Sequence, residues 1–123
     1  MKLQHLSIDH VTGVLYACEA VENAPRATSF GTDIKSSPLF SRSYEVATEH
    51  LLNVLTAIPD MAIIELQALV WAGRGNFDGN LSENLDYSRT RFDSTTRDYL
   101  ASKNQLRESI QYSLHTCNVT LRD

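Results

Sequence analysis

An arginine between two glycines is the part of the sequence where residue type and spacing most clearly suggest chemistry. Gly73, Arg74 and Gly75 follow a long apolar segment and precede Asn-Phe-Asp-Gly-Asn at 76–80. Glycines on both sides leave room around a guanidinium group, whose planar fork matches a carboxylate or a phosphate. One hypothesis is therefore that Arg74 is presented to an anionic ligand.

The same residues can simply end a helix. Glycine adopts the left-handed conformation at a helix C-terminus without steric penalty, so the pattern predicts that conformation for Gly73. Arg74 would then interact with the negative end of the helix dipole. On this interpretation Gly73, Gly75 and Gly79 are structural turn residues, and the segment has no ligand.

Two known kinds of binding loop do not fit this segment. Asn76, Asp78 and Asn80 alternate as in a calcium-binding loop. However, Gly79 stands one place too early, and Tyr87 occupies the position of the closing glutamate. The Gly-Lys-Ser/Thr ending of a phosphate-binding loop is also absent from the sequence.

Catalytic and metal-binding motifs are not found elsewhere in the sequence. The four histidines form neither an HExxH nor a Glu-x-x-His arrangement, and there is no GxSxG. Cys18 and Cys117 lie too far apart for a CxxC motif, so we expect two free, semi-buried thiols in a reducing compartment. A disulfide between them is the alternative, because the sequence does not give their separation. The sequence predicts no catalytic residues, no metal and no cofactor.

Composition and charge restrict the classes of function. The chain has 123 residues and a formal net charge of −4, from 11 Lys and Arg against 15 Asp and Glu. An acidic chain is a poor candidate for phosphate-driven binding of nucleic acid. The N-terminus lacks the apolar run of a signal peptide, and no segment is long enough to span a bilayer. We therefore expect a single cytoplasmic domain over residues 1–123 that binds neither nucleic acid nor membrane.

Apolar residues at spacings of three and four predict an all-α bundle of about five helices. Ser7 is the expected N-cap of a first helix that ends near Asn23. An irregular loop is expected at about 24–38, where prolines, serines and threonines are frequent. The remaining helices are expected at about 41–57, at about 60–73, over 81–92, around Tyr99, and from Leu106 to Cys117.

The segment MAIIELQALVWA, residues 61–72, predicts a central helix, because it is apolar on nearly every side. Only Glu65 and Gln67 are polar within it. Asp60 is expected to be its N-cap. The predicted fold is therefore a compact bundle of about five helices around this central apolar helix, at about 60–73.

This segment also carries a resemblance to a known family. ELQALVWAGRGNFD, followed by TTRDYLASKNQLRESIQYSL, resembles a bacterial family described as domain of unknown function 3775. Its signature, Ala-Leu-x-Trp-x-Gly-Arg-Gly-Asp with a later Tyr-Leu, is matched here by Leu69, Trp71, Gly73, Arg74, Gly75, Tyr99 and Leu100. The resemblance covers the second half of the chain, and Asn76 stands where the family has Asp. It implies a compact helical bacterial protein and brings no activity.

The sequence leads to two functional hypotheses. The first is a non-enzymatic helical module that binds another protein through the turn at 73–80, with Trp71, Arg74, Phe77 and Asp78 at the contact. A small inhibitor from a phage or a mobile element would fit this description, and a homo-oligomer is compatible with it. Trp71 would form a binding anchor if it is exposed, and part of the core if it is buried.

The alternative hypothesis is a regulator that binds a small anion or a nucleotide. Arg74 would be the main contact, helped by the nearby arginines. Those arginines alternate with acidic residues, which favours a salt-bridged helix surface over a contact with nucleic acid. They are Arg89, Arg91, Arg97 and Arg107.

Overall fold

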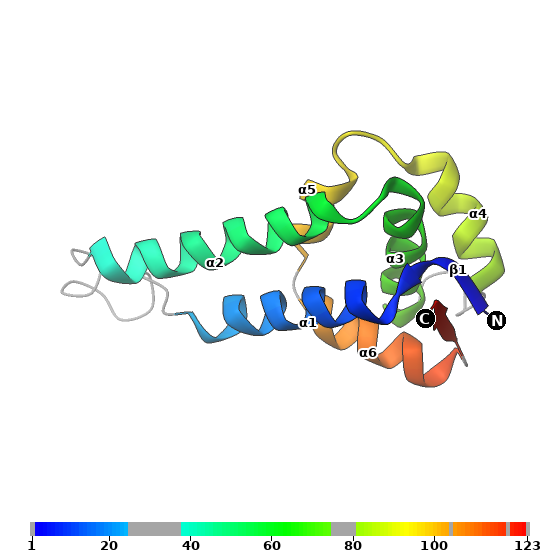
Figure 1. The fold of residues 1–123 in the computed structure, drawn as a ribbon, viewed down its shortest axis with the longest axis horizontal. Coiled ribbons are helices and arrows are strands. Elements are labelled where there is room, and N and C mark those ends of the chain that lie inside the picture. Colours follow the sequence, from blue (N-terminus) through cyan, green and yellow to red (C-terminus); the bar gives the residue numbers. More distant parts are fainter. Residues whose placement is uncertain (1, 25–37, 75–80, 104, 118, 123) are drawn as a thin grey trace.

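The computed structural model describes residues 2–24, 38–74, 81–103, 105–117 and 119–122 (Figure 1). Its elements in chain order are β1 (Lys2–Ser7), α1 (Ile8–Asn23), α2 (Pro38–Ala57), α3 (Asp60–Gly73), α4 (Leu81–Arg91), α5 (Thr96–Ala101), α6 (Leu106–Thr116) and β2 (Thr120–Arg122). The predicted all-α class is confirmed, since these residues form six helices and only one short two-stranded sheet. Among the described residues, no helix has both the length and the apolar character needed to cross a bilayer.

The helices form a long hairpin joined to a more compact group. Figure 1 shows α1 and α2 side by side, with α3 lying across one end of this pair. Around α3 pack α4, α6 and β1, while α5 contacts α2. The main apolar core lies where these elements meet, and the hairpin contacts the rest of the molecule through α6, β1 and α5.

Helix α1 begins and ends where the sequence predicts. Ser7 is its N-cap: the Ser7 Oγ accepts a hydrogen bond from the His10 N–H, and His10 Nδ1 accepts one from the Ser7 N–H, both at 3.1 Å. Each bond satisfies a backbone donor that helix geometry leaves without a partner. The helix ends at Asn23 and buries one face, formed by Val11, Val14, Ala17 and Cys18.

Helix α2 also ends as predicted but begins earlier. It runs from Pro38 rather than from about residue 41, which agrees with the preference of proline for the first turn of a helix. The rest of the predicted loop, residues 25–37, lies outside the described residues. The helix ends at Ala57, two residues before Pro59.

The prediction that Asp60 caps the central helix is wrong. The N-cap position is Pro59, which has no side-chain acceptor, and Asp60 is the first helical residue. Its carboxylate instead forms a salt bridge with Arg97 at 2.9 Å. The same guanidinium donates to the carbonyl oxygens of Leu55 (3.0 Å) and Ile58 (2.6 Å), so it holds the end of α2 against the start of α3.

Helix α3 is the predicted central helix, and every residue from 62 to 72 is buried. Its two buried polar residues, Glu65 and Gln67, have partners on neighbouring elements. The Ser88 hydroxyl on α4 lies 2.9 Å from Gln67 Oε1 and donates to the carbonyl oxygen of Ile64 at 2.8 Å. Asn84, also on α4, donates from Nδ2 to the carbonyl oxygen of Ala68 at 3.2 Å. Side chains of α4 therefore bond directly to the backbone of α3.

The two strands are a feature that the sequence analysis did not predict. β1 and β2 come from opposite ends of the chain and pair in parallel, with Lys2 beside Thr120 and Ser7 beside Arg122. β1 is also held by Glu65 of α3. The side-chain oxygens of Glu65 accept from the N–H groups of Gln4 (3.1 Å), His5 (3.0 Å) and Leu6 (2.7 Å). A buried acid thus explains how a strand attaches to an otherwise apolar helix.

Candidate functional site

Gly73 does not have the left-handed conformation that the sequence predicts. It is the last residue of α3, and packing explains the glycine. A Cβ atom at this position would overlap the carbonyl oxygen of Ser109 and lie 2.7 Å from its carbonyl carbon and 2.8 Å from Ser113 Oγ. Ser113 also donates to the carbonyl oxygen of Leu69. The backbone of α6 therefore lies directly against the end of α3.

Arg74 follows as the C-cap of α3. Its N–H donates to the carbonyl oxygens of Val70 and Trp71, each at 3.1 Å, which ends the helix with the chain at φ −94° and ψ 5°. The exposed Arg74 side chain lines a hollow of about 510 Å³ between the ends of α3, α5 and α6. The side chains that face it with Arg74 include Tyr99, Lys103, Gln105, Glu108 and Tyr112.

The surroundings of Tyr99 in this hollow lower the pKa of its hydroxyl group. Burial alone raises the pKa of Tyr99, but other effects outweigh it. Hydrogen bonds involving Trp71 and Lys103 lower that pKa, and so do the positive charges of Lys103 and Arg74. The pKa of Tyr99 therefore lies below its ordinary value of 10.0. Lys103 Nζ also lies 4.1 Å from the centre of the Tyr99 ring, a cation–π contact.

The first turn of α6 forms another part of the wall. Gln105 is its N-cap residue and gives no side-chain hydrogen bond to the helix. It has φ 60° and ψ 31°, a left-handed conformation that costs about 1 kcal/mol or more for a residue with a Cβ. The positive end of the α6 dipole adds to the charge of Arg74 and Lys103. Among the described residues of this wall Glu108 is the acidic one, and its carboxylate lies 3.4 Å from Arg107.

Trp71 lies beneath this surface and is 8% exposed. Its indole Nε1 donates to the Tyr99 hydroxyl at 3.5 Å, and its ring centre is 5.5 Å from that of Tyr87. Trp71, Tyr87, Arg91 and Tyr99 line a second hollow of about 260 Å³. The two hollows meet at Tyr99, so Trp71 supports the aromatic wall from behind and is not an exposed anchor.

Four other predicted site residues cannot be placed relative to this hollow. Gly75, Phe77, Asp78 and Gly79 all lie outside the described residues, and their predicted roles stay predictions. Conversely, Lys103, Gln105 and Tyr112 belong to no motif in the sequence and were not predicted as site residues. The spacing of Tyr99 and Lys103, four residues apart, was a signal for an aromatic–cation pair. Nothing local signalled that this pair would face Arg74.

The arginines of the second half mostly form the predicted salt-bridged surface. Arg89 pairs with Asp86 at 3.3 Å on α4. Arg107 on α6 makes three hydrogen bonds to the carboxylate of Glu22 on α1. Its Nε donates to both oxygens at 3.2 Å and its Nη2 donates to Oε1 at 2.7 Å, so this ion pair joins the two helices. Arg91 instead stacks on Tyr87 at 4.9 Å. These side chains are spread over the surface, so they do not join Arg74 in one cluster.

The described residues contain no group of three or more His, Cys, Asp or Glu placed to hold a metal ion. Comparisons with protein-family models, with curated proteins and with solved structures find no significant match to this chain. The described side chains of the candidate site include two cations, two tyrosines and the acid Glu108, around a polar hollow beside the N-terminus of α6.

Cys18 and Cys117 form no disulfide, as predicted, and differ in burial. Cys18 is buried in α1, and desolvation, followed by the charges of Glu22 and Glu108, raises its pKa from 9.0 to about 12. Cys117 is half-buried. We expect a disulfide reagent at pH 8 to modify one thiol quickly, and Cys117→Ser to remove that reaction, because the thiolate is the reactive form.

The raised pKa of Cys18 also gives a pH dependence. The unfolded chain loses this thiol proton near pH 9, while the folded chain retains it up to about pH 12. The contribution of Cys18 to stability is therefore complete below pH 9 and is lost as the pH rises toward 12. Cys18→Ala should reduce the alkaline loss of stability in urea unfolding, whereas fast modification of Cys18 in the native protein would contradict its burial.

Proposed function

We propose that this protein is a binding module that takes an anionic ligand, of phosphate or carboxylate chemistry, in the hollow between α3, α5 and α6. The observation that carries the proposal is that Arg74 and Lys103 line the same hollow as Tyr99, although they come from different parts of the chain. Two cations facing one polar hollow favour a negatively charged group at their common focus.

The size and the walls of the hollow agree with a small ligand. Its volume of about 510 Å³ is within the usual range of small-molecule sites. The rings of Tyr99 and Tyr112 supply flat surfaces for a planar group, and the start of α6 supplies a positive dipole. A small nucleotide or a phosphorylated metabolite combines these properties, which is the second of the two hypotheses from the sequence.

The other hypothesis, a partner protein bound through the turn at 73–80, stays a prediction. Trp71 is too deeply buried to be its exposed anchor, and most of the turn lies outside the described residues. Membership of the family of domain of unknown function 3775, a bacterial origin and a cytoplasmic location also stay predictions.

The proposal is tested by thermal unfolding in the presence of inorganic phosphate, nucleoside monophosphates and citrate. A ligand that binds only the folded chain raises the melting temperature, by an amount that grows with the logarithm of its concentration relative to its Kd. We expect at least one phosphate-bearing compound to do so. Arg74→Ala and Lys103→Ala should each weaken its binding about 10-fold or more, since a charge-assisted hydrogen bond contributes about 1.5–3 kcal/mol.

The matched control is Arg89→Ala, which removes an exposed arginine that pairs with Asp86 and lines neither hollow. It should leave ligand affinity unchanged. The proposal is wrong if none of the compounds raises the melting temperature. It is also wrong if Arg89→Ala weakens binding as much as Arg74→Ala, because attraction would then depend on overall charge.

Tyr99 provides a direct spectroscopic readout of the same site. The difference between the ultraviolet pH titrations of the wild type and Tyr99→Phe should show a phenol that ionises below pH 10. A bound anion offsets the charges of Arg74 and Lys103, so it should raise that pKa again. An unchanged titration at saturating ligand would place the ligand elsewhere.

A further inference from the structure

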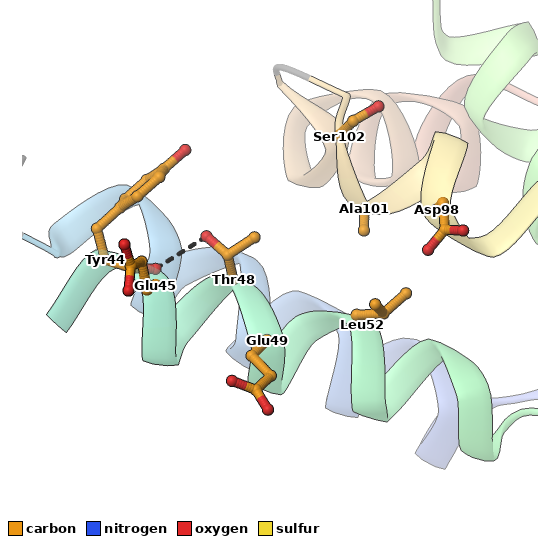
Figure 2. A pocket seen from close by; sticks show the side chains of 8 residues that line it. All are labelled: Tyr44, Glu45, Thr48, Glu49, Leu52, Asp98, Ala101 and Ser102. Carbon is orange, nitrogen blue, oxygen red and sulfur yellow. Dashed lines mark hydrogen bonds between the residues drawn. The ribbon is translucent and has the colours of Figure 1, made fainter. Parts of the chain in front are cut away.

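A third hollow, of different character, lies between α2 and α5. Tyr44, Thr48 and Leu52 stand four residues apart on α2 and point toward Ala101 and Ser102 at the end of α5 (Figure 2). The Thr48 hydroxyl donates to the carbonyl oxygen of Tyr44 at 2.9 Å, so its hydrogen is already used within the helix. The hollow measures about 420 Å³ and its surface is mainly apolar. We call it the α2–α5 groove.

Acidic side chains surround this groove. Glu45 and Glu49 on α2 and Asp98 on α5 line it, and none of its described lining residues is a lysine or an arginine. Within the described part of the chain, none of these three acids forms a salt bridge. By contrast, the acids Glu22, Asp60 and Asp86 each pair with an arginine. An apolar floor with an unpaired acidic rim is complementary to an apolar side chain flanked by positive charges.

We propose that the α2–α5 groove is a docking site for a basic amphipathic segment of a partner protein. A leucine- or phenylalanine-sized side chain would fill the space that the small residues Ala101 and Ser102 leave open. Lysines or arginines beside it would face Glu45, Glu49 and Asp98. The α2 wall from Tyr44 to Leu52 spans about 12 Å at 1.5 Å per residue, which matches about two turns of a bound helix.

Charge complementarity decides between this occupant and the alternatives. A second copy of this chain would bring a net charge of −4 toward an acidic rim, and a phosphate backbone would be repelled by the same carboxylates. The groove is also separate from the anion-binding hollow, since the two share no lining residue. The proposal of a docking site is therefore independent of the proposed function, and either can be wrong without the other.

The test uses three synthetic helical peptides and the full chain at 150 mM salt, with fluorescence anisotropy as the readout. The first peptide has leucines on one face and lysines on the other. In the second the lysines are replaced by glutamates, and in the third the leucines are replaced by alanines. We expect the leucine–lysine peptide to bind at least 10-fold more tightly than either of the others, because the groove requires both charge and apolar contact.

Variants of the chain locate the binding. Glu49→Lys and Glu45→Lys change exposed positions on α2 and should each weaken the leucine–lysine peptide at least 10-fold. Ala101→Leu should do the same by filling the groove, and its melting temperature shows whether it remains folded. The matched control is Glu19→Lys, which reverses an exposed acid on the neighbouring helix α1 and should change the affinity less than twofold.

Three results would overturn the proposal. The first is no binding of the leucine–lysine peptide to the wild type. The second is equal weakening by Glu19→Lys and Glu49→Lys, which would show general attraction to an acidic protein. The third is a dimer in light scattering that Glu49→Lys dissociates, because the occupant would then be a second copy of this chain.

Discussion

Gly73→Ala is expected to lower the free energy of unfolding by about 2–3 kcal/mol, in the upper part of the range for overpacking. The new methyl group would overlap the main-chain carbonyl of Ser109, and a backbone atom cannot rotate away as a side chain can. Helices α3 and α6 would have to separate, which would also strain the hydrogen bond from Ser113 to Leu69. The better helix propensity of alanine offsets only about 1 kcal/mol of this effect.

The matched control is Gly13→Ala in α1. A Cβ atom there would meet only Val54 Cγ1 at 3.7 Å, an ordinary van der Waals distance. This variant should therefore be as stable as the wild type or more stable by up to about 1 kcal/mol. Urea unfolding followed by circular dichroism measures both variants. If Gly73→Ala proved as stable as Gly13→Ala, the close approach of α3 and α6 would be wrong.

Glu65→Ala is expected to lower the free energy of unfolding by about 3 kcal/mol. The side-chain oxygens of Glu65 accept from three consecutive N–H groups of β1, and the Leu6 N–H is fully buried among them. Each buried donor that loses its acceptor costs about 1–3 kcal/mol, less where water can reach it. The strand should also detach locally, so hydrogen exchange at residues 4–6 should become faster than in the rest of the core.

Two further variants separate this role from a general effect of losing an acid. Glu65→Gln keeps an oxygen for two of the donors but places an amide nitrogen near the third, so about half of the loss is expected. Glu19→Ala removes an exposed acid from α1 and should change stability by less than about 0.5 kcal/mol. Normal protection of the β1 amides in Glu65→Ala would contradict the proposed attachment.

The correct helix predictions rest on signals that act within one or two turns. Ser7 caps α1 because its side chain reaches a backbone N–H three residues away. The end of α2 follows from Pro59, and the central position of α3 follows from a segment with apolar residues on all sides. Such signals depend on neighbours in the sequence, so a pattern of residue types is sufficient to read them.

The wrong predictions, for Asp60 and Gly73, concern residues whose structural role depends on contacts with residues far away in the sequence. Asp60 has the side chain of a good N-cap, but Arg97 on α5 binds its carboxylate. Gly73 has the position of a left-handed helix stop, but the approach of Ser109 on α6 explains the glycine. In both cases the residue type was interpreted from its neighbours, while its structural role depends on an element packed against it.

Even less of the two candidate sites could be predicted from the sequence. Arg74 attracted attention because glycines flank it, but Lys103 and Tyr112 meet it only through the packing of α3 against α6. In the sequence, the acids of the α2–α5 groove resemble an ordinary solvated helix face. Only the structure shows that they line a groove together with Ala101 and Ser102.

The sequence by itself thus determined the helical class, the buried central helix and most of the helix ends, because periodicity, proline and capping are local properties. Only the tertiary structure decided why residue 73 is glycine, how Glu65 holds the N-terminal strand, and which cations share a hollow with Arg74. These features depend on contacts between residues far apart in the chain. Such contacts follow from how whole helices pack, and no short pattern of residue types encodes them.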